Sequence, residues 1–420
     1  MSHYRERRLA LARRLAGVGL IHVPGGKPVP RNSDVEYAFR QSSDFLYLTG
    51  VEEPGCHLII DPDKRREVLF VPRIDNHHRV WEGHVPGPAE ARRLFDVDRV
   101  MYADELKKAL GRRKTATKAK LRDALDDLRA CKTQAELALM RRATEVSGAA
   151  HRALMAAARP GMREYQLQAV FDSECLKAGL KHLAYPSIVA SGVNSAVLHY
   201  RRNDAILKEG DLLLVDAGAE CKGYAADITR TFPVNGRFTR RQRDVYQIVL
   251  ETQKSCMDRA RVGAISAELH VHSMRLIAEG LKSLGILRGD VDGLVEGGAV
   301  RLFYPHGLTH MLGLDVHDVT GGKRRRLPNP TKVPVRFVAR LEPGFVITME
   351  PGVYFIAALI KDSKLRGKHK TSIDFAKAES FLDFGGVRIE DDVVIQPEGP
   401  ALDLTSVPKE IADVEAACAR

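Results

Sequence analysis

The chain has 420 residues and a formal net charge of +11 at pH 7, with 65 lysines and arginines against 54 aspartates and glutamates. Its hydrophobic share of 44% and charged share of 28% are typical of a soluble globular protein, and no apolar run is long enough to cross a membrane. A chain of this length exceeds one ordinary hydrophobic core, so we expect two domains.

The first 17 residues are rich in arginine but lack the continuous apolar stretch of a secretory signal. We interpret them as an amphipathic helix with Leu9, Leu11 and Leu15 facing inward; a transit peptide is the alternative. The six cysteines are scattered, without C-x-x-C or other paired spacing. This pattern predicts free thiols in a reducing compartment, and therefore a cytoplasmic protein.

Residues 1–127 are expected to form a small α/β domain. Apolar segments at 46–50, 56–60 and 68–71 predict strands, because turns rich in proline, glycine and aspartate separate them. The single tryptophan, Trp81, lies in a polar stretch, where it either packs half-buried or caps a pocket across an interface. The basic run at 112–122 has almost no apolar periodicity and marks the boundary region.

The excess positive charge is concentrated in this run and again at 323–326. Nucleic-acid binding is one explanation. No helix-turn-helix, zinc-finger or aromatic stacking pattern accompanies the charge, however. We therefore favour a solvated linker and loop, and expect no nucleic-acid partner.

Residues 128–420 are expected to form the second domain. Thr133 with Glu136 is a capping box that predicts a helix ending at Pro160, and Thr239 and Ser266 predict the starts of two more helices. Segments 185–190, 303–314, 345–355 and 387–395 predict strands. Helices mixed with antiparallel strands, without βαβ alternation, indicate an α+β fold.

Two aspartates stand where apolar core residues are expected, in segment 212–230. If the chain folds back near Cys221 and Lys222, Asp216 lies opposite Asp227 on one face of a hairpin. Two carboxylates in an apolar setting repel each other and do not both stay ionised without a cation between them. Either a shared proton or a metal ion satisfies this requirement.

More polar groups interrupt apolar segments of the same domain. Taken singly, each has an ordinary structural explanation, such as a core histidine with its hydrogen bonds satisfied or a surface ion pair. Their occurrence in the same domain as the two aspartates favours a catalytic or metal-binding role. They are His306, His310, His317, Glu350, Arg388 and Glu390.

The four carboxylates of this set carry charge that two divalent cations would neutralise. Oxygen ligands with one imidazole suit Mn²⁺, Fe²⁺, Co²⁺ or Zn²⁺. Two such ions about 3.5–4 Å apart share a water, deprotonate it and polarise a carbonyl. The sequence therefore predicts a hydrolase, in which the remaining histidines stabilise the oxyanion and move protons.

The motifs HGLTHMLGLDVHD at 306–318, TMEPGVY at 348–354 and GVRIEDD at 386–392 resemble those of the pita-bread metallopeptidases. The chain is most similar to the proline-specific branch, which contains Xaa-Pro dipeptidases and Xaa-Pro aminopeptidases. Segments 39–45, 53–55 and 69–73 are similar to the amino-terminal domain of that branch. The resemblance implies a pita-bread catalytic domain preceded by a smaller α/β domain.

The resemblance also implies a role for each ligand. Asp216 binds one metal ion, and His310 with Glu350 binds the other. Asp227 and Glu390 bridge the two ions, which are expected to be Mn²⁺, with Zn²⁺, Co²⁺ and Fe²⁺ as alternatives. Glu350 also takes the proton of the attacking water.

Further residues take roles by the same resemblance. Two histidines contact the substrate and stabilise the intermediate, an arginine orients a ligand carboxylate, and other side chains bind the substrate. A homodimer is expected, because related enzymes bring a tryptophan to the partner's site. These residues are His199, His317, Arg388, Tyr185, Ile188, His306 and Trp81.

The specificity depends on the bond before proline, which lacks an N–H and isomerises slowly, so that general proteases bind it poorly. A dipeptidase must bind the free carboxylate of a carboxy-terminal proline, preferably with an arginine fork. A long insertion after His317 contains Arg336, fourteen residues before Glu350, where prolidases place such an arginine; a solvated base is the plain alternative. We predict an Xaa-Pro dipeptidase, with an Xaa-Pro aminopeptidase acting on longer peptides as the alternative and a non-catalytic binding protein on the same fold as a third.

Overall fold

The computed structural model describes residues 2–335 and 337–419. Its contacts divide the chain into two compact units. The smaller unit contains the residues up to Ala130 together with Val319–Arg325, and the larger unit contains Cys131–Asp318 and the chain from Arg326 onward. The sequence places the boundary after residue 127 and does not predict that segment 319–325 belongs with the first domain.

The smaller unit is built on a four-stranded sheet of order β1-β4-β5-β6. Its strands are β1 (Ile21–Pro24), β4 (His57–Asp61), β5 (Arg66–Val71) and β6 (Arg99–Tyr102), antiparallel except for the parallel pair β5–β6. The other elements of this unit are α1 (His3–Arg14), β2 (Pro30–Asn32), β3 (Val35–Glu36), α2 (Ser43–Thr49), α3 (Asn76–Trp81), α4 (Pro88–Leu94), η1 (Ala103–Glu105), α5 (Leu106–Leu110), α6 (Lys118–Ala130) and η4 (Lys323–Arg325).

Two sequence predictions in this unit have different outcomes. The first helix is found as predicted, with Leu11 buried and Leu15 buried directly after its end, whereas Leu9, also predicted to face inward, is only partly buried. The strand predicted at 46–50 is wrong, because this segment belongs to helix α2, which Gly50 ends in the left-handed conformation at φ 66°. Leu46, Tyr47 and Leu48 are all buried, and a short apolar run that is buried on every side does not distinguish a strand from a helix.

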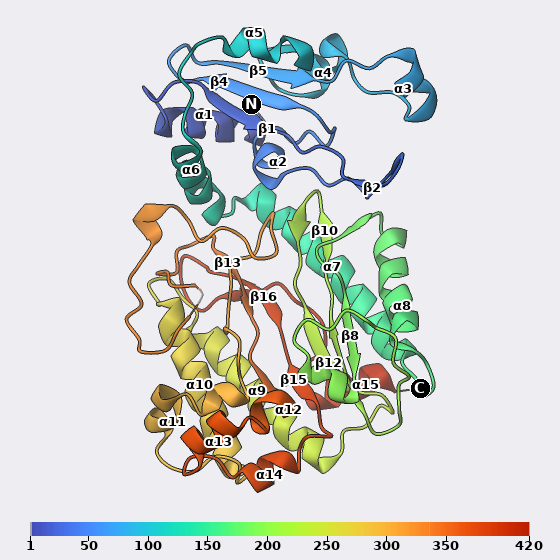
Figure 1. Cartoon of the computed structure of the whole chain (residues 1–420), viewed down its shortest axis with the longest axis vertical. Helices are drawn as coiled ribbons and strands as arrows, with labels where there is room; N and C mark the ends of the chain where they lie inside the picture. Colours follow the sequence, from blue (N-terminus) through green and yellow to red (C-terminus); the bar gives the residue numbers. More distant parts are fainter. Residues whose placement is uncertain (1, 336, 420) are drawn as a thin grey trace. The chain divides into compact units, whose positions relative to one another are not determined.

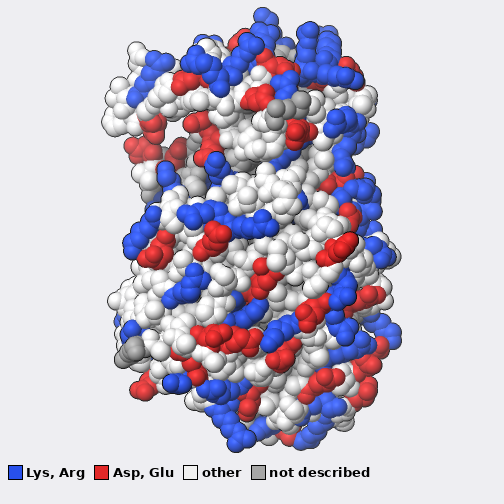
Figure 2. All heavy atoms as spheres, turned by 180° about the vertical axis from the view of Figure 1, so that it is seen from behind, with Lys and Arg blue, Asp and Glu red and all other residues white. Residues whose placement is uncertain are grey.

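The basic segment at 323–326 is partly neutralised inside the smaller unit. Arg324 Nε donates to the buried carboxylate of Asp127 at 2.6 Å, and Arg325 Nη1 donates to the Asp127 carbonyl oxygen at 2.9 Å. Arg14 also pairs with Asp127. On the face of the molecule shown in Figure 2, basic and acidic side chains are interspersed over the larger unit.

The larger unit combines antiparallel strands with long helices (Figure 1). Its helices are α7 (Gln134–Ala157), α8 (Glu164–Lys177), η2 (Gly192–Ala196), α9 (Arg240–Arg259), α10 (Ser266–Ser283), α11 (Val291–Gly297), η3 (Val300–Leu302), α12 (Ala357–Ile360), α13 (Ser363–His369), α14 (Phe375–Glu379) and α15 (Ile411–Cys418). Its strands are β7 (His182–Leu183), β8 (Ile188–Ser191), β9 (Leu212–Asp216), β10 (Ala219–Cys221), β11 (Tyr224–Ala225), β12 (Thr229–Pro233), β13 (Val346–Met349), β14 (Gly352–Tyr354), β15 (Gly386–Arg388), β16 (Asp391–Val394) and β17 (Leu402–Asp403).

These strands form two halves, each covered by its own helices. Sheets β11-β10-β7 and β12-β9-β8 pack against α7 and α8, whereas β13, β14 and β15 pack against α9 (Figure 1). An antiparallel bridge between Thr229 and Glu390 joins the halves. The predicted α+β fold is confirmed, and the apolar core runs continuously through both halves.

The helix starts in this unit follow from local sequence. Thr133 and Thr239 cap α7 and α9 in the predicted capping boxes with Glu136 and Gln242. Ser266 is the first residue of α10 and not its cap, because its hydroxyl donates to a carbonyl outside the helix, 2.8 Å away. No helix among the described residues has both the length and the apolar character needed to cross a membrane.

The strand predicted at 303–314 is wrong, although its position matters for the site. The segment is irregular and accompanies β13 through separated hydrogen bonds, such as Thr348 N to His310 O at 3.0 Å and Glu350 N to Leu308 O at 2.9 Å. Only Met311 forms a bridge, with Ile347. These bonds place His310 beside β13, directly after which Glu350 follows.

Candidate metal centre

The two aspartates of the first half lie on the two arms of the predicted hairpin, which turns at Lys222 and Gly223, but its register differs from the prediction. Strand β9 pairs with β12 so that Asp216 faces Thr229, and Asp227 lies in the break before β12. The predicted register of Asp216 opposite Asp227 is therefore wrong. The two arms of the hairpin approach each other tightly here, because a Cβ atom on Gly218 would lie only 1.9 Å from the carbonyl oxygen of Ala226. Glycine allows this close approach, which brings the arm that carries Asp227 beside the arm that carries Asp216.

Three of the predicted ligands converge on one point. Asp227, His310 and Glu390 each offer a ligand atom, and these atoms all lie within 4.8 Å of one another. His310 Nε2 is 3.4 Å from Asp227 Oδ2. His310 Nδ1 lies 3.0 Å from the Met311 carbonyl oxygen, so this nitrogen carries the proton and leaves Nε2 as the ligand atom.

The remaining two predicted ligands adjoin this group. Glu350 Oε1 lies 3.7 Å from His310 Nε2. Asp216 Oδ2 accepts a hydrogen bond of 2.5 Å from Arg388, whereas its buried Oδ1 has no hydrogen-bond partner among the described residues. An unpaired oxygen of this kind, buried beside other carboxylates, is what a cation ligand provides.

The positive groups in the cluster are too few to neutralise its carboxylates. Burial raises the pKa of Asp216 despite Arg388, and burial together with Asp227 and Glu350 raises the pKa of Glu390 well above its ordinary range. Burial also raises the pKa of Glu350 to about 7, although His310 and Arg388 oppose the shift. Since four acidic side chains meet one arginine and one histidine ligand, the residues fit divalent metal ions.

His310 responds to the same charges in the opposite direction. Burial alone lowers its pKa, but the hydrogen bond to Asp227 and the charges of Glu350 and Asp227 outweigh burial and raise the pKa to about 9. A cation at this position replaces the proton that the metal-free site would take up.

Arg388 connects the ligands of the two halves. Its Nη2 donates to Asp216, its Nε donates to the Thr229 hydroxyl at 3.1 Å, and its Nη1 donates to the Tyr354 hydroxyl at 2.9 Å. The Thr229 hydroxyl in turn donates to Glu390 Oε2 at 2.6 Å. The arginine therefore orients two carboxylates at once.

The three predicted histidines outside the ligand set lie in different environments. His306 Nε2 is 2.8 Å from the Tyr354 hydroxyl, and its Nδ1 is 3.5 Å from Glu350 Oε2. Burial lowers the pKa of His306 to about 3, and His199 is close enough for its charge to contribute. The rings of His317 and His310 have their centroids 4.3 Å apart.

The remaining predicted substrate residues fall into two groups. Ile188 is buried and pairs directly with Asp216 across β8 and β9, and the buried hydroxyl of Tyr185 has a pKa raised by burial and by carboxylates of the cluster. Trp81 belongs to the smaller unit, where its side chain is 72% exposed. Arg336 lies outside the described residues.

Several supporting residues were missed in the sequence. Asp392 Oδ2 accepts from the Asp227 backbone nitrogen at 3.1 Å, and Arg230 Nη1 donates to the Glu390 carbonyl oxygen at 2.8 Å. Arg230 also pairs with Asp391 at 2.6 Å, and both side chains are fully buried. The acidic pair that follows Glu390 in an apolar strand was a usable signal, since buried charges need partners.

The core histidine His151 gives the stability a testable dependence on pH. Its Nε2 donates to the Ala217 carbonyl at 2.9 Å, and burial lowers its pKa from 6.5 to about 4. Between these values the unfolded chain binds the proton and the folded chain does not, so stability falls as the pH falls from about 7 to 4. In urea unfolding we expect the free energy of unfolding to fall between pH 7 and pH 4 in both proteins, but by up to about 3 kcal/mol less in His151→Gln than in the natural chain. Parallel curves for the two proteins would contradict this assignment.

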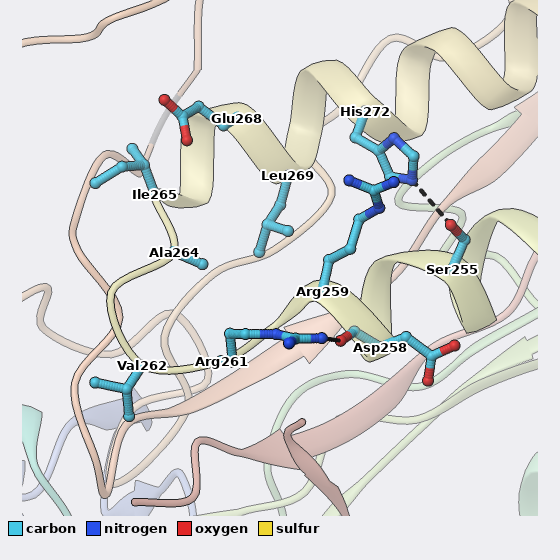
Figure 3. Close-up of a pocket in the computed structure, with 10 residues that line it drawn as sticks. All are labelled: Ser255, Asp258, Arg259, Arg261, Val262, Ala264, Ile265, Glu268, Leu269 and His272. Atoms are coloured by element: carbon cyan, nitrogen blue, oxygen red, sulfur yellow. Dashed lines mark hydrogen bonds between the residues drawn. The ribbon is translucent and has the colours of Figure 1, made fainter. Parts of the chain in front are cut away.

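The larger unit also has a separate hollow (Figure 3). It has a volume of about 740 Å³ and lies between the end of α9 and the start of α10. Ser255 Oγ and His272 Nε2 are 2.9 Å apart at its wall, beside Arg259. None of the predicted site residues that the structure describes is among its lining residues, so the candidate centre is the ligand cluster.

This chain is similar to known metallopeptidases, as expected for a protein with a metal centre. Residues 138–397 match metallopeptidase family M24, and residues 4–121 match the aminopeptidase P amino-terminal domain. The human Xaa-Pro dipeptidase is 35% identical over 95% of this chain and 88% of its own length, and a probable Xaa-Pro aminopeptidase of Coccidioides posadasii is 37% identical over 95% and 92%.

A solved structure extends the similarity to the whole fold. Zinc-substituted aminopeptidase P of E. coli in complex with product superposes with a TM-score of 0.86 at 34% identity, covering 100% of this chain and 98% of that chain. The pita-bread fold with its amino-terminal domain, expected from the sequence motifs, is thereby confirmed. The chain belongs to metallopeptidase family M24.

Proposed function

We propose that the chain is an Xaa-Pro dipeptidase, which hydrolyses the peptide bond before a carboxy-terminal proline. The observation that supports metal-dependent hydrolysis is the convergence of Asp227, His310 and Glu390, with Asp216 and Glu350 beside them. We assign these five residues as the ligands of two divalent cations. Bound cations supply an activated water and polarise the carbonyl of the scissile bond.

The side chains around the ligands supply the proton transfers. We assign Glu350 to accept the proton of the attacking water, because its carboxylate lies among the ligands, 3.7 Å from His310 Nε2. His306 links Glu350 to the Tyr354 hydroxyl and Arg388 through close polar contacts. We assign His199 and His317 to hold the substrate and the oxyanion, with Tyr185 and Ile188 lining the pocket.

The preference for dipeptides depends on the insertion between His317 and Glu350. We assign Arg336 in this insertion to bind the free carboxylate of proline through a guanidinium fork. The similarity to the human Xaa-Pro dipeptidase, which extends over 95% of the chain, supports this choice. The comparable similarity to aminopeptidase P supports a second candidate, an Xaa-Pro aminopeptidase that acts on longer peptides.

A substrate series with two arginine variants separates these candidates. We expect Ala-Pro to be cleaved with a higher kcat/KM than Ala-Pro-Ala, and Arg336→Ala to lower kcat/KM for Ala-Pro by about 100-fold, mainly through KM. Arg326→Ala, in the same insertion and exposed, is the matched control. If the tripeptide is preferred, or if both variants retain full dipeptide cleavage, the aminopeptidase assignment replaces the dipeptidase.

The metal, the assembly and the location follow as parts of the same proposal. We propose Mn²⁺ as the metal, a homodimer in which Trp81 reaches the partner's substrate site, and a cytoplasmic location. Elemental analysis of protein purified without added metal tests the first, and light scattering of the natural chain and Trp81→Ala tests the second. Protein without bound metal and without Ala-Pro cleavage at any supplied metal would instead indicate a non-catalytic binding protein.

A further inference from the structure

The first residue of α8, Glu164, is a buried carboxylate with no place in the chemistry above. Its side chain is completely shielded from solvent. A buried carboxylate is costly unless hydrogen bonds compensate for the lost water. Five hydrogen bonds do so here, and all of their donors are neutral groups.

These donors come from a single segment of the chain, residues 191–205. Ser191 donates to Oε1 from its backbone nitrogen at 2.8 Å and from its hydroxyl at 2.7 Å, and Asn194 Nδ2 donates to the same oxygen at 3.3 Å. The Tyr200 hydroxyl at 2.9 Å and the Ala205 backbone nitrogen at 3.0 Å donate to Oε2. One side chain thus holds the beginning, middle and end of the segment.

The segment has little regular structure of its own, and besides Glu164 it is held near its end by Asn203, whose side chain accepts from the Val189 nitrogen at 3.1 Å and donates to the Ser187 carbonyl oxygen at 2.8 Å. After Ser191 it contains only the short 3-10 turn η2 and no strand pairing. Its outer contact is with β15, where the Ser195 hydroxyl accepts from the Gly386 nitrogen at 2.8 Å. This second anchor places the segment against the strand that ends at Arg388.

His199 is held between these two anchors. Its neighbour Tyr200 is buried in an apolar cluster with Ile188 and Tyr354, and its hydroxyl is fixed by Glu164. The His199 side chain itself is exposed and lies near His306. The position of His199 therefore follows from the position of Tyr200.

We propose that Glu164 is a positioning residue: it fixes segment 191–205 and thereby sets His199 at the distance from the metal ligands that substrate binding requires. The inference rests on the proposed role of His199 in the reaction. Without the carboxylate, the buried N–H group of Ser191 and the partly buried N–H group of Ala205 lose their acceptor, and the segment relaxes to satisfy them elsewhere.

Glu164→Gln tests the proposal with little change in volume. It converts one acceptor oxygen into an NH₂ group that faces N–H and O–H donors. Glu174→Gln, on the same helix with a partly exposed side chain that pairs with Lys177, is the matched control. We expect E164Q to lower kcat/KM for the preferred Xaa-Pro peptide by about 10-fold to 100-fold with unchanged metal content, and E174Q to leave it unchanged.

A double-mutant cycle shows whether Glu164 acts through His199. His199→Ala is expected to lower kcat/KM, and the E164Q/H199A double variant is expected to be no worse than H199A, because the segment then has no histidine to place. If the two losses multiply, Glu164 has only a general structural role and the inference is wrong. If H199A is as active as the natural chain, the proposed role of His199 fails and the inference fails with it.

A measurement that needs no peptidase activity completes the test. Hydrogen exchange of residues 191–205 is expected to be faster in E164Q than in E174Q, with the rest of the larger unit unchanged. Equal exchange in the two variants would overturn the inference even if the enzyme acted on other substrates. Should E164Q not fold, Tyr200→Phe removes a single donor, and the same cycle with H199A is expected to show a smaller loss, about threefold to tenfold, that again does not multiply.

Discussion

Glu390→Gln is expected to abolish peptidase activity and, at the same time, to stabilise the metal-free protein. Glu390 is 2% exposed and lies near Asp216, Asp227 and Glu350, whose charges raise its pKa after burial. Loss of a carboxylate ligand removes several kcal/mol of transition-state stabilisation, so we expect kcat/KM to fall by at least about 10³-fold and the bound metal to decrease.

The stability change has the opposite sign, because without a cation the buried Glu390 carboxyl must either stay ionised beside other carboxylates or take up a proton, and both reduce the free energy of unfolding. The Thr229 hydroxyl, 2.6 Å from Glu390, retains an oxygen acceptor in the glutamine variant. Urea unfolding in the presence of a chelator should therefore show E390Q more stable by on the order of 1–3 kcal/mol. Glu398→Gln, an exposed carboxylate nearby in sequence, serves as the control. A variant less stable than the natural chain in chelator, or one retaining a tenth of its activity, would contradict the assignment.

Arg388→Met is expected to produce the reverse effect on stability. Its guanidinium is the cation that holds Asp216, and it also bonds to Thr229 and Tyr354. Removing it leaves Asp216 buried beside the other carboxylates without its partner, at a cost of about 3–5 kcal/mol in the metal-free protein. Activity should fall by about 10-fold to 100-fold because the ligand carboxylates lose their orientation.

Two companion variants identify the cause of that loss. Arg388→Lys keeps the charge but not the three-way fork, so it should regain part of the stability and little of the activity. Asp216→Asn in the R388M background removes the unpaired charge and should recover stability in chelator without recovering activity. If Asp216→Asn lowers the stability of R388M further instead of restoring it, then Arg388 does not stabilise the protein by pairing with the charge of Asp216.

The sequence predicted the features of this protein that depend on neighbouring residues. The capping boxes at Thr133 and Thr239 begin α7 and α9 as predicted, because capping requires only side chains three residues apart. The α+β class followed from the succession of helical and apolar segments. The acidic and histidine side chains of the candidate centre were found because charge in an apolar segment is unusual and needs an explanation.

Only the tertiary structure decided features that depend on direction and partnership. Whether segment 46–50 forms a strand or a helix, and whether Asp216 faces Asp227 or Thr229, depend on contacts that an apolar pattern does not encode. The same is true of Arg388, which reaches back to Asp216 at a separation of 172 residues, and of Glu164, which holds a segment up to 41 residues away. A sequence shows which charges must be compensated, because burial makes an unpaired charge costly; which group compensates each of them is fixed only when distant parts of the chain pack together.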